Sequence, residues 1–201
     1  MKELTIGIDI GGTNTKYGIV GRQGNVVFQG SISTAQYEEF KDYFAGLSKA
    51  LREAIKAVPG SHKMMGVGVG AANGNYYKGT IERATNLKWK GIIPLADMIR
   101  EEFDLPAIIT NDANAAAVGE MVYGAAKGMK DFVVITLGTG LGSGFVTNGQ
   151  LLNGKHGIAG EVGHTSVNPA GRHCNCGKRG CLETYVSATG IKRTVYKLLA
   201  D

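Results

Sequence analysis

The chain opens with T-I-G-I-D-I-G-G-T-N-T-K-Y-G-I-V, residues 5–20, in which two short apolar strands flank a turn made by Gly11, Gly12 and Thr13. Apolar runs separated by such a turn are typical of a β-hairpin. A further turn leads to another apolar run at residues 26–32. The opening therefore predicts a three-stranded antiparallel meander.

The same pattern returns in the second half of the chain, as V-I-T-L-G-T-G-L-G-S-G-F-V-T at residues 134–147. An apolar strand runs into a glycine-rich turn at residues 138–144, and a short strand is expected at residues 145–147. A weak internal repeat at half-chain separation predicts two similar lobes rather than a solenoid.

Helices and strands alternate between the two hairpins and after them. Apolar residues three or four apart predict a long helix at residues 37–58, which Pro59 and Gly60 end. The other elements that we expect are strands at 64–70 and 107–110 and helices at 95–103, 113–126 and 186–199. This order predicts an α/β fold whose mixed sheet contains parallel crossovers.

Asn111 and Asp112 stand between an expected strand and an expected helix. Asp112 has a simple structural interpretation as the N-cap of that helix. Ligand chemistry, however, also collects at the carboxyl ends of parallel strands in open α/β sheets. Asp112 is therefore a candidate for either role.

All three cysteines lie close together, and we interpret them with His164 as a zinc site. Three thiolates and one imidazole complete a tetrahedral set, and sulfur ligands select Zn²⁺ over Mg²⁺ or Ca²⁺. Because protein ligands fill all four positions, the zinc would be structural. The expected ligands are His164, Cys174, Cys176 and Cys181.

Two alternatives to this zinc site stay open at the level of the sequence. His156 and His173 compete with His164 for the fourth position, although His173 would have to fold back sharply. Two cysteines could instead form a disulfide, but Cys-x-Cys has poor geometry for one and an odd count leaves a thiol over. A zinc loop would also hold the flanking carboxylates of Glu161 and Glu183 in place.

The glycine turns could bind phosphate, because glycine leaves backbone N–H groups open to oxygen ligands. Asp9, beside the first turn, could hold Mg²⁺ through water. Taken singly, each turn could equally be an ordinary hairpin. A P-loop is absent from the sequence. A dinucleotide pattern at residues 66–71 lies inside an apolar strand and is not followed by a helix, so we reject it.

The composition of the chain argues against a nucleic-acid-binding, a membrane or a secreted protein. The net charge of +5 and the pI near 9.1 indicate only a moderate excess of basic residues. These residues are scattered along the sequence and form no basic stripe, so we expect no nucleic-acid partner. No apolar run reaches the length of a membrane span, and the first residues lack a signal-peptide pattern. A cysteine cluster without disulfide spacing favours the cytoplasm.

These motifs together resemble those of the ROK family of sugar kinases. D-I-G-G-T at residues 9–13 and L-G-T-G-L-G-S-G at 137–144 resemble its two phosphate motifs, and Asn111-Asp112 its catalytic pair. G-E-V-G-H at 160–164, with the C-x-C-G-x-x-G-C-x-E run that follows, is similar to its sugar and zinc signature.

The resemblance implies an actin/hexokinase-like (ribonuclease H-like) α/β fold with two lobes and a cleft. It places the first lobe at residues 1–112 and part of the second at residues 113–201. Family members continue well past this length, and the additional part supplies much of the second lobe and the adenosine pocket. The resemblance therefore implies an incomplete second lobe.

The implied activity is ATP-dependent phosphorylation of a hexose hydroxyl, C6 of glucose in the first instance, with Asp112 as the general base. The implied sugar ligands are Asn86, Asn111, Asp112, Glu161, His164 and Glu183. The residues implied for nucleotide phosphate and Mg²⁺ are Asp9, Gly11, Gly12, Thr13, Gly138, Thr139 and Gly140. ATP, Mg²⁺ and structural Zn²⁺ are thus the expected cofactors.

Three further interpretations accompany this one. The motifs are also similar to those of N-acetylmannosamine and N-acetylglucosamine kinases. ROK repressors share the fold but carry an N-terminal DNA-binding domain, for which the few residues before the first strand leave no room. A non-catalytic sugar-binding protein or fragment is the remaining alternative.

Relatives often form dimers, so a homodimer is compatible with the resemblance.

Overall fold

The structure is a computed structural model that describes residues 1–84 and 86–200. It contains two compact units, Met1–Ala115 and Ala116–Asp201. The division falls inside helix α3 (Asp112–Tyr123), slightly later than the lobe boundary at residue 112 expected from the sequence.

The first unit is built on a five-stranded sheet in the order β3-β2-β1-β4-β8. Strands β1, β2 and β3 are antiparallel neighbours, whereas β4 and β8 run parallel to β1. This confirms the predicted mixed α/β sheet with parallel crossovers. The strands are β1 (Lys2–Ile10), β2 (Asn14–Gly21), β3 (Val26–Ser33), β4 (His62–Ala71) and β8 (Ala107–Thr110).

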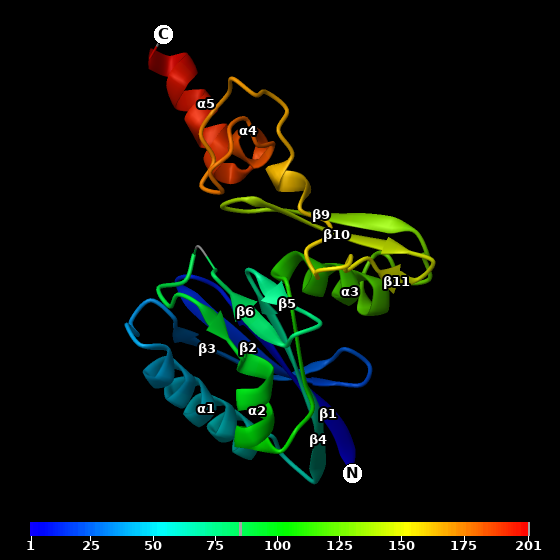
Figure 1. Ribbon diagram of the computed structural model, residues 1–201. Coiled ribbons are helices and arrows are strands. Elements are labelled where there is room, and N and C mark those ends of the chain that lie inside the picture. The colour runs from blue at the N-terminus through cyan, green and yellow to red at the C-terminus, as the bar shows by residue number, and fades with distance from the viewer. Residues whose placement is uncertain (85, 201) are drawn as a thin grey trace. The chain divides into compact units, whose positions relative to one another are not determined.

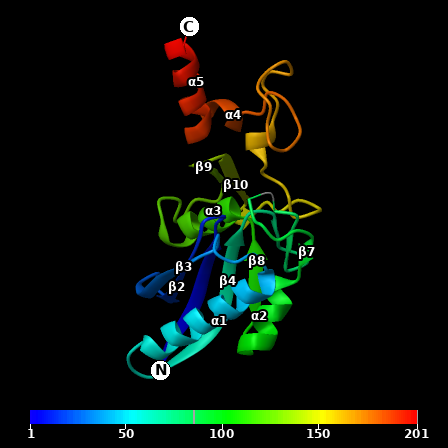
Figure 2. The same cartoon turned by 90° about the vertical axis from the view of Figure 1, so that its left-hand side faces the viewer.

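Helices α1 (Phe40–Ala57) and α2 (Leu95–Phe103) cover one face of this sheet, as both views show (Figure 1, Figure 2). Tyr43, Leu47 and Leu51 lie four residues apart on α1 and are buried. Their spacing puts them on one side of the helix, which packs on the apolar side chains of the sheet. The first unit therefore has a continuous hydrophobic core.

A small second sheet in the first unit was not predicted. It contains β5 (Gly74–Asn75), β6 (Thr80–Glu82) and β7 (Ile92–Ile93), joined in that order by antiparallel pairing. Strands of two or three residues are too short to give a periodic signal in the sequence.

The second unit contains a three-stranded antiparallel sheet in the order β11-β10-β9. These are β11 (Gln150–Leu151), β10 (Leu141–Thr147) and β9 (Phe132–Leu137). The expected long turn at residues 138–144 is wrong. Gly142 and Gly144 pair with β9, so β10 begins at Leu141 and only Gly138, Thr139 and Gly140 remain in the turn.

After this sheet the second unit continues as a long loop with two short helices and a longer closing helix. It carries the 3₁₀ helix η1 (Val162–His164), α4 (Glu183–Val186) and α5 (Ala188–Ala200). The single closing helix expected at residues 186–199 is wrong, because Ser187 has extended backbone angles and separates α4 from α5. Among the described residues, no helix combines the length and apolarity that crossing a membrane would require.

Candidate functional site

The first glycine turn is held from behind by buried hydroxyl groups. The carbonyl oxygen of Thr13 accepts the backbone N–H groups of Thr34 and Ala35 at 2.9 and 3.2 Å. Behind the turn, Thr15 Oγ1 shares hydrogen bonds of 2.8 Å with Thr34 Oγ1 and with the Tyr43 hydroxyl. Buried and mutually satisfied polar groups of this kind specify one conformation. The turn is therefore a rigid element.

Asn86 lies against this same turn. A Cβ atom at Gly12 would be 2.5 Å from the backbone carbonyl oxygen of Asn86. The absence of a side chain at Gly12 is what lets the two backbones approach. A residue implied for sugar binding and a residue implied for phosphate binding are thus in direct contact in the first unit.

We expect Gly12→Ala to destabilise the first unit by about 1–3 kcal/mol, the usual cost of forcing extra atoms into a packed site. The added methyl group meets backbone, which cannot rotate away as a side chain can. Trp89 is the only tryptophan and packs on Tyr43 and Phe40, so its fluorescence can follow urea unfolding.

Gly7→Ala is the matched control, because Gly7 lies in β1, the strand that leads into the turn, and a Cβ atom there meets nothing within 4 Å. It should leave stability unchanged or raise it slightly. Equal unfolding midpoints for the Gly12→Ala and Gly7→Ala variants would contradict the contact between the turn and Asn86.

Asn111 and Asp112 join β8 to α3. Of the two roles that the sequence left open for Asp112, the structure does not support the N-cap, because Asp112 is the first residue of the helix. Asn111 occupies the capping position, and its Oδ1 accepts the backbone N–H of Ala113 at 2.8 Å. Oδ1 of Asp112 accepts the same N–H at 2.8 Å, and its side chain is exposed. Asn111 therefore fixes the helix start, and Asp112 presents a carboxylate to solvent.

Asp112 acts electrostatically on Asp9. Partial burial and the negative charge of Asp112 raise the pKa of Asp9, whereas the positive charge of Lys16 lowers it. Asp9 keeps an exposed surface, so its desolvation is incomplete. Both acids lie at the carboxyl ends of parallel strands, β1 and β8, where α/β sheets bind ligands.

Lys16 was missed as a member of this group. It stands directly opposite Asp9 across the β1–β2 hairpin. Opposite residues on antiparallel strands interact, so counting outward from the predicted turn could have found the pair.

We expect Asp112→Asn to lower the pKa of Asp9 towards its ordinary value of 3.8. Because a raised pKa means that ionised Asp9 opposes folding, this cost is absent below about pH 3.8 and present in full above the raised pKa. The variant should therefore gain stability at neutral pH and not at pH 3. Titration of the Asp9 carboxyl by ¹³C NMR measures the pKa, with Asp104→Asn as the control.

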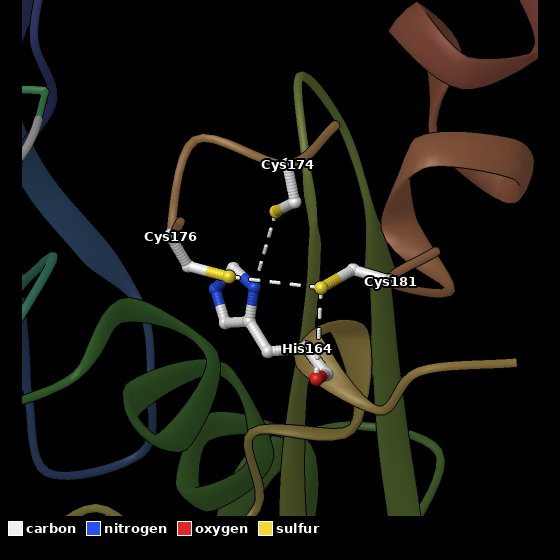
Figure 3. Close-up of side chains that lie close together, drawn as sticks. All are labelled: His164, Cys174, Cys176 and Cys181. Carbon is white, nitrogen blue, oxygen red and sulfur yellow. Dashed lines mark hydrogen bonds between the residues drawn. The ribbon is translucent and has the colours of Figure 1, made fainter. Parts of the chain in front are cut away.

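The second unit brings together the four side chains that the sequence predicts as metal ligands (Figure 3). One ligand atom from each of His164, Cys174, Cys176 and Cys181 lies within 4.8 Å of all the others. Nδ1 of His164 is 3.6 Å from Sγ of Cys174, and the sulfurs of Cys176 and Cys181 are also 3.6 Å apart. The histidine comes from η1 and the cysteines from the loop before α4.

The cluster fits a tetrahedral metal ion better than a disulfide. A tetrahedron with metal–sulfur bonds of about 2.3 Å has edges of about 3.8 Å, close to the separations found. All three cysteines are free, and 3.6 Å is far longer than an S–S bond of about 2 Å. Burial raises the pKa of the Cys174 and Cys181 thiols, so a cation would be needed to hold both as thiolates.

Of the competing histidines, neither His156 nor His173 belongs to this cluster. His173 forms an isolated β-bridge with Arg179 within the loop. The preference for His164 is therefore supported by the geometry of the described residues.

Glu183 connects the cysteine cluster to the second glycine turn. Its Oε1 accepts a hydrogen bond from the Cys174 thiol at 2.9 Å and lies 3.6 Å from Nδ1 of His164. Its Oε2 would be 2.7 Å from a Cβ atom at Gly140 and accepts the N–H of Leu141 at 3.5 Å. A side chain at Gly140 would therefore require the Glu183 carboxylate to move away from the turn.

Glu161 immediately precedes η1, the helix that carries His164, and its side chain is exposed. The second unit thus holds His164 and the Glu183 carboxylate at the candidate metal site, with Glu161 at the start of η1. The first unit holds another glycine turn with Asp9, Asn86, Asn111 and Asp112. Carboxylates and amides can bind hydroxyls, carboxylates can hold a hard cation, and backbone N–H groups can bind phosphate oxygens.

Comparison with known proteins decides the family. The ROK family model matches residues 5–200. The chain belongs to the ROK family. As a ROK protein it is 44% identical over 195 residues to a glucokinase of Halalkalibacterium halodurans, covering 94% of this chain and 58% of that protein. It is also 34% identical over 197 residues to a xylose repressor of Caldicellulosiruptor bescii, covering 96% of this chain and 49% of that protein.

A solved structure supports the fold. The ROK family glucokinase from Streptomyces griseus, in complex with glucose and AMPPNP, superposes with a TM-score of 0.79 at 36% identity. The match covers 96% of this chain and 60% of that one. The chain thus spans about three fifths of the length of these kinases, in agreement with the expected incomplete second lobe.

Proposed function

We propose that this ROK chain carries the sugar site and the phosphate-binding turns of an ATP-dependent hexose kinase, with C6 of glucose as the acceptor. The observation that carries the proposal is the nearness of two like charges, Asp9 and Asp112, beside a glycine turn held by backbone hydrogen bonds. Similarity to glucokinases, one of them solved with glucose and AMPPNP, supports glucose and ATP.

In the proposed reaction Asp112 takes the proton of the sugar hydroxyl as its oxygen attacks the γ-phosphorus of ATP. An exposed carboxylate can do this, because little charge accumulates before phosphoryl transfer is under way. Asp9 is suited to hold Mg²⁺ through water, and N–H groups of both glycine turns, residues 11–13 and 138–140, to contact phosphate oxygens.

Sugar hydroxyls would be bound by the carboxylates of Glu161 and Glu183, the amides of Asn86 and Asn111, and the ring of His164. With Nδ1 of His164 directed at the cysteines, Nε2 is left to hydrogen-bond a hydroxyl. Metal-bound histidines commonly use the second nitrogen in this way. The metal that the cysteine cluster would hold is structural Zn²⁺, which fixes His164 and Glu183 in place.

The test is ADP release from MgATP by the 201-residue chain with glucose, mannose, fructose, N-acetylglucosamine and N-acetylmannosamine. We expect turnover with glucose. Turnover with an N-acetylated sugar alone would support the N-acetylmannosamine or N-acetylglucosamine kinase alternative. Calorimetric binding of a sugar without any turnover would leave a sugar-binding or regulatory protein, as the similarity to a xylose repressor allows.

The proposal includes the cytoplasm as the compartment, since the three cysteines are free thiols. It includes small molecules as partners, namely a hexose and ATP. A homodimer belongs to the same proposal, and light scattering of the purified chain would test it.

A further inference from the structure

A single arginine, Arg172, ties the cysteine loop to helices α4 and α5, which lie beside the loop (Figure 1). It stands two residues before Cys174, the first cysteine of the candidate metal site. Its Nη1 donates to the carbonyl oxygens of Thr184 on α4 and Gly190 on α5, at 2.7 and 2.9 Å. Its Nη2 donates to Oγ1 of Thr194 on α5 at 2.8 Å. One guanidinium thus joins the loop to both helices.

The ring of Tyr185 holds the same arginine. The guanidinium carbon of Arg172 lies 4.8 Å from the centre of the Tyr185 ring, which is a cation–π contact. The backbone N–H of Arg172 also donates to the Tyr185 hydroxyl at 3.2 Å. A Cβ atom at Gly171 would be 2.0 Å from that hydroxyl oxygen, so the glycine is what lets the loop pass this close to α4. Arg172 is half-buried, so water competes only partly for its hydrogen bonds.

The contacts of α4 lead from Arg172 to Glu183. Thr184, whose carbonyl oxygen accepts from Arg172, directly follows Glu183 at the start of α4. The Glu183 carboxylate lies at the cysteine cluster, where Oε1 is 2.9 Å from Sγ of Cys174, and at the second glycine turn, where Oε2 faces Gly140. Because Arg172 holds the first turn of α4, it also holds the backbone from which this carboxylate extends.

The contacts of α5 lead from Arg172 to the same glycine turn. The N–H of Ala188, the first residue of α5, donates to the carbonyl oxygen of Gly138 at 3.0 Å. Gly190, which accepts from Arg172, belongs to the same first turn of α5 and is buried. The arginine therefore secures α5 against the loop, and α5 secures the turn. Two routes, one through each helix, run from Arg172 to residues 138–140.

We propose that Arg172 is a positioning residue, which fixes the Glu183 carboxylate and the glycine turn at residues 138–140 relative to the cysteine loop. In the proposed function Glu183 binds the sugar and the turn contacts phosphate, so Arg172 sets the spacing between two substrate sites. The inference rests on the proposed function for these two roles, but the contacts of Arg172 do not. A guanidinium reaches several acceptors at once from one plane, whereas a lysine ammonium is a single point charge.

The experiment replaces Arg172 with alanine in the 201-residue chain. The Ala188 amide, which bonds to the turn, should exchange its hydrogen at least about 10-fold faster, a typical effect of losing a hydrogen bond to a charged group. Glucose affinity, measured by calorimetry, should fall by a similar factor. The metal content should equal that of the parent chain, because none of the four ligands is changed.

Chemical rescue separates positioning from general destabilisation. Millimolar guanidinium ion should occupy the space left in the Arg172→Ala variant and restore both Ala188 protection and glucose affinity, which it cannot do for a loop that has simply unfolded. Arg172→Lys should recover only part of the loss. Thr194→Val, which removes one acceptor of the guanidinium from α5, should act in the same direction as Arg172→Ala with a smaller effect.

The matched control is Arg179→Ala, which removes the same charge from the same loop. The Arg179 side chain is exposed and donates to the carbonyl oxygen of Gly171, within the loop, at 3.5 Å rather than to a helix. This variant should keep the parent values of Ala188 exchange, glucose affinity and metal content.

Two results would overturn the inference. One is an Arg172→Ala variant whose Ala188 exchange matches the parent, because Arg172 would then not hold α5 and the turn. The other is a variant that loses its metal and that guanidinium does not restore, because Arg172 would then serve only the folding of the loop. If the parent chain binds no sugar, the proposed function fails, whereas the exchange and rescue measurements still decide the role of Arg172.

Discussion

Cys181→Ser is expected to release the metal and to destabilise the second unit by at least about 4 kcal/mol, as loss of a metal site commonly does. Cys181 is completely buried, and its backbone pairs with Ser166 across the loop. Serine offers a hard oxygen in place of a soft thiolate, and it cannot move closer to the ion because its backbone is held. Because the four ligands come together only in the folded loop, the free energy of metal binding contributes directly to the free energy of folding.

Two measurements check this expectation. Elemental analysis should find about one zinc per parent chain and close to none in the variant. Hydrogen exchange should become faster in the loop at residues 165–181, while the first unit keeps its unfolding midpoint by Trp89 fluorescence. Calorimetry should also show weaker sugar binding, because Glu183 and His164 contact Cys174 and lose their orientation with the cluster.

The matched control is a pair of histidine variants. His164→Asn should lose metal, whereas His173→Asn should retain it, because only His164 contributes to the cluster. Equal zinc contents in these two variants would refute the assignment of the fourth ligand. A carefully purified parent chain without zinc would refute the metal site itself.

Features that depend on residues close together in the sequence were predictable. The glycine turns at residues 11–13 and 138–140 stand between apolar runs, and both prove to be antiparallel hairpins. The cysteine spacing indicates a tetrahedral site, because ligands a few residues apart on one loop can converge without help from the rest of the fold. The predicted helix at Leu95–Phe103 and strand at Ala107–Thr110 match the structure residue for residue.

Features that depend on contact between distant segments were not predictable. The approach of Asn86 to Gly12 joins residues far apart in the chain, as does the approach of Glu183 to Gly140. In the sequence, Gly12 and Gly140 both look like ordinary loop glycines. The N-cap at Asn111 and the break at Ser187 each depend on the conformation of a single residue. Hydrophobic periodicity does not locate a helix boundary to one residue.

Strand β9 shows how sequence and structure complement each other. The repeat in the sequence predicts two similar lobes, each with an apolar strand before its glycine turn. Ile8 and Ile135 stand at the same distance before the two turns, yet Ile8 is 4% exposed and Ile135 is 45% exposed. The sequence pattern alone does not distinguish these two environments.

Asp112→Asn is expected to lower sugar phosphorylation by about 10²–10⁴-fold, the usual contribution of a general base. The amide keeps an oxygen that can accept the N–H of Ala113, so the start of α3 should stay intact. What is lost is the basic carboxylate that would take the proton of the attacking hydroxyl. Sugar affinity should change by less than about threefold, because an amide oxygen still accepts from a hydroxyl.

ADP release and sugar calorimetry on the same preparations separate these two effects, since a misfolded site would lose both. Asp104→Asn is the matched control: Asp104 caps α2 with left-handed backbone angles that asparagine tolerates, and it lies outside the proposed site. It should leave both readouts unchanged. Turnover by Asp112→Asn at the parent rate would show that another group accepts the proton, and Asp9, its electrostatic partner, would be the next candidate.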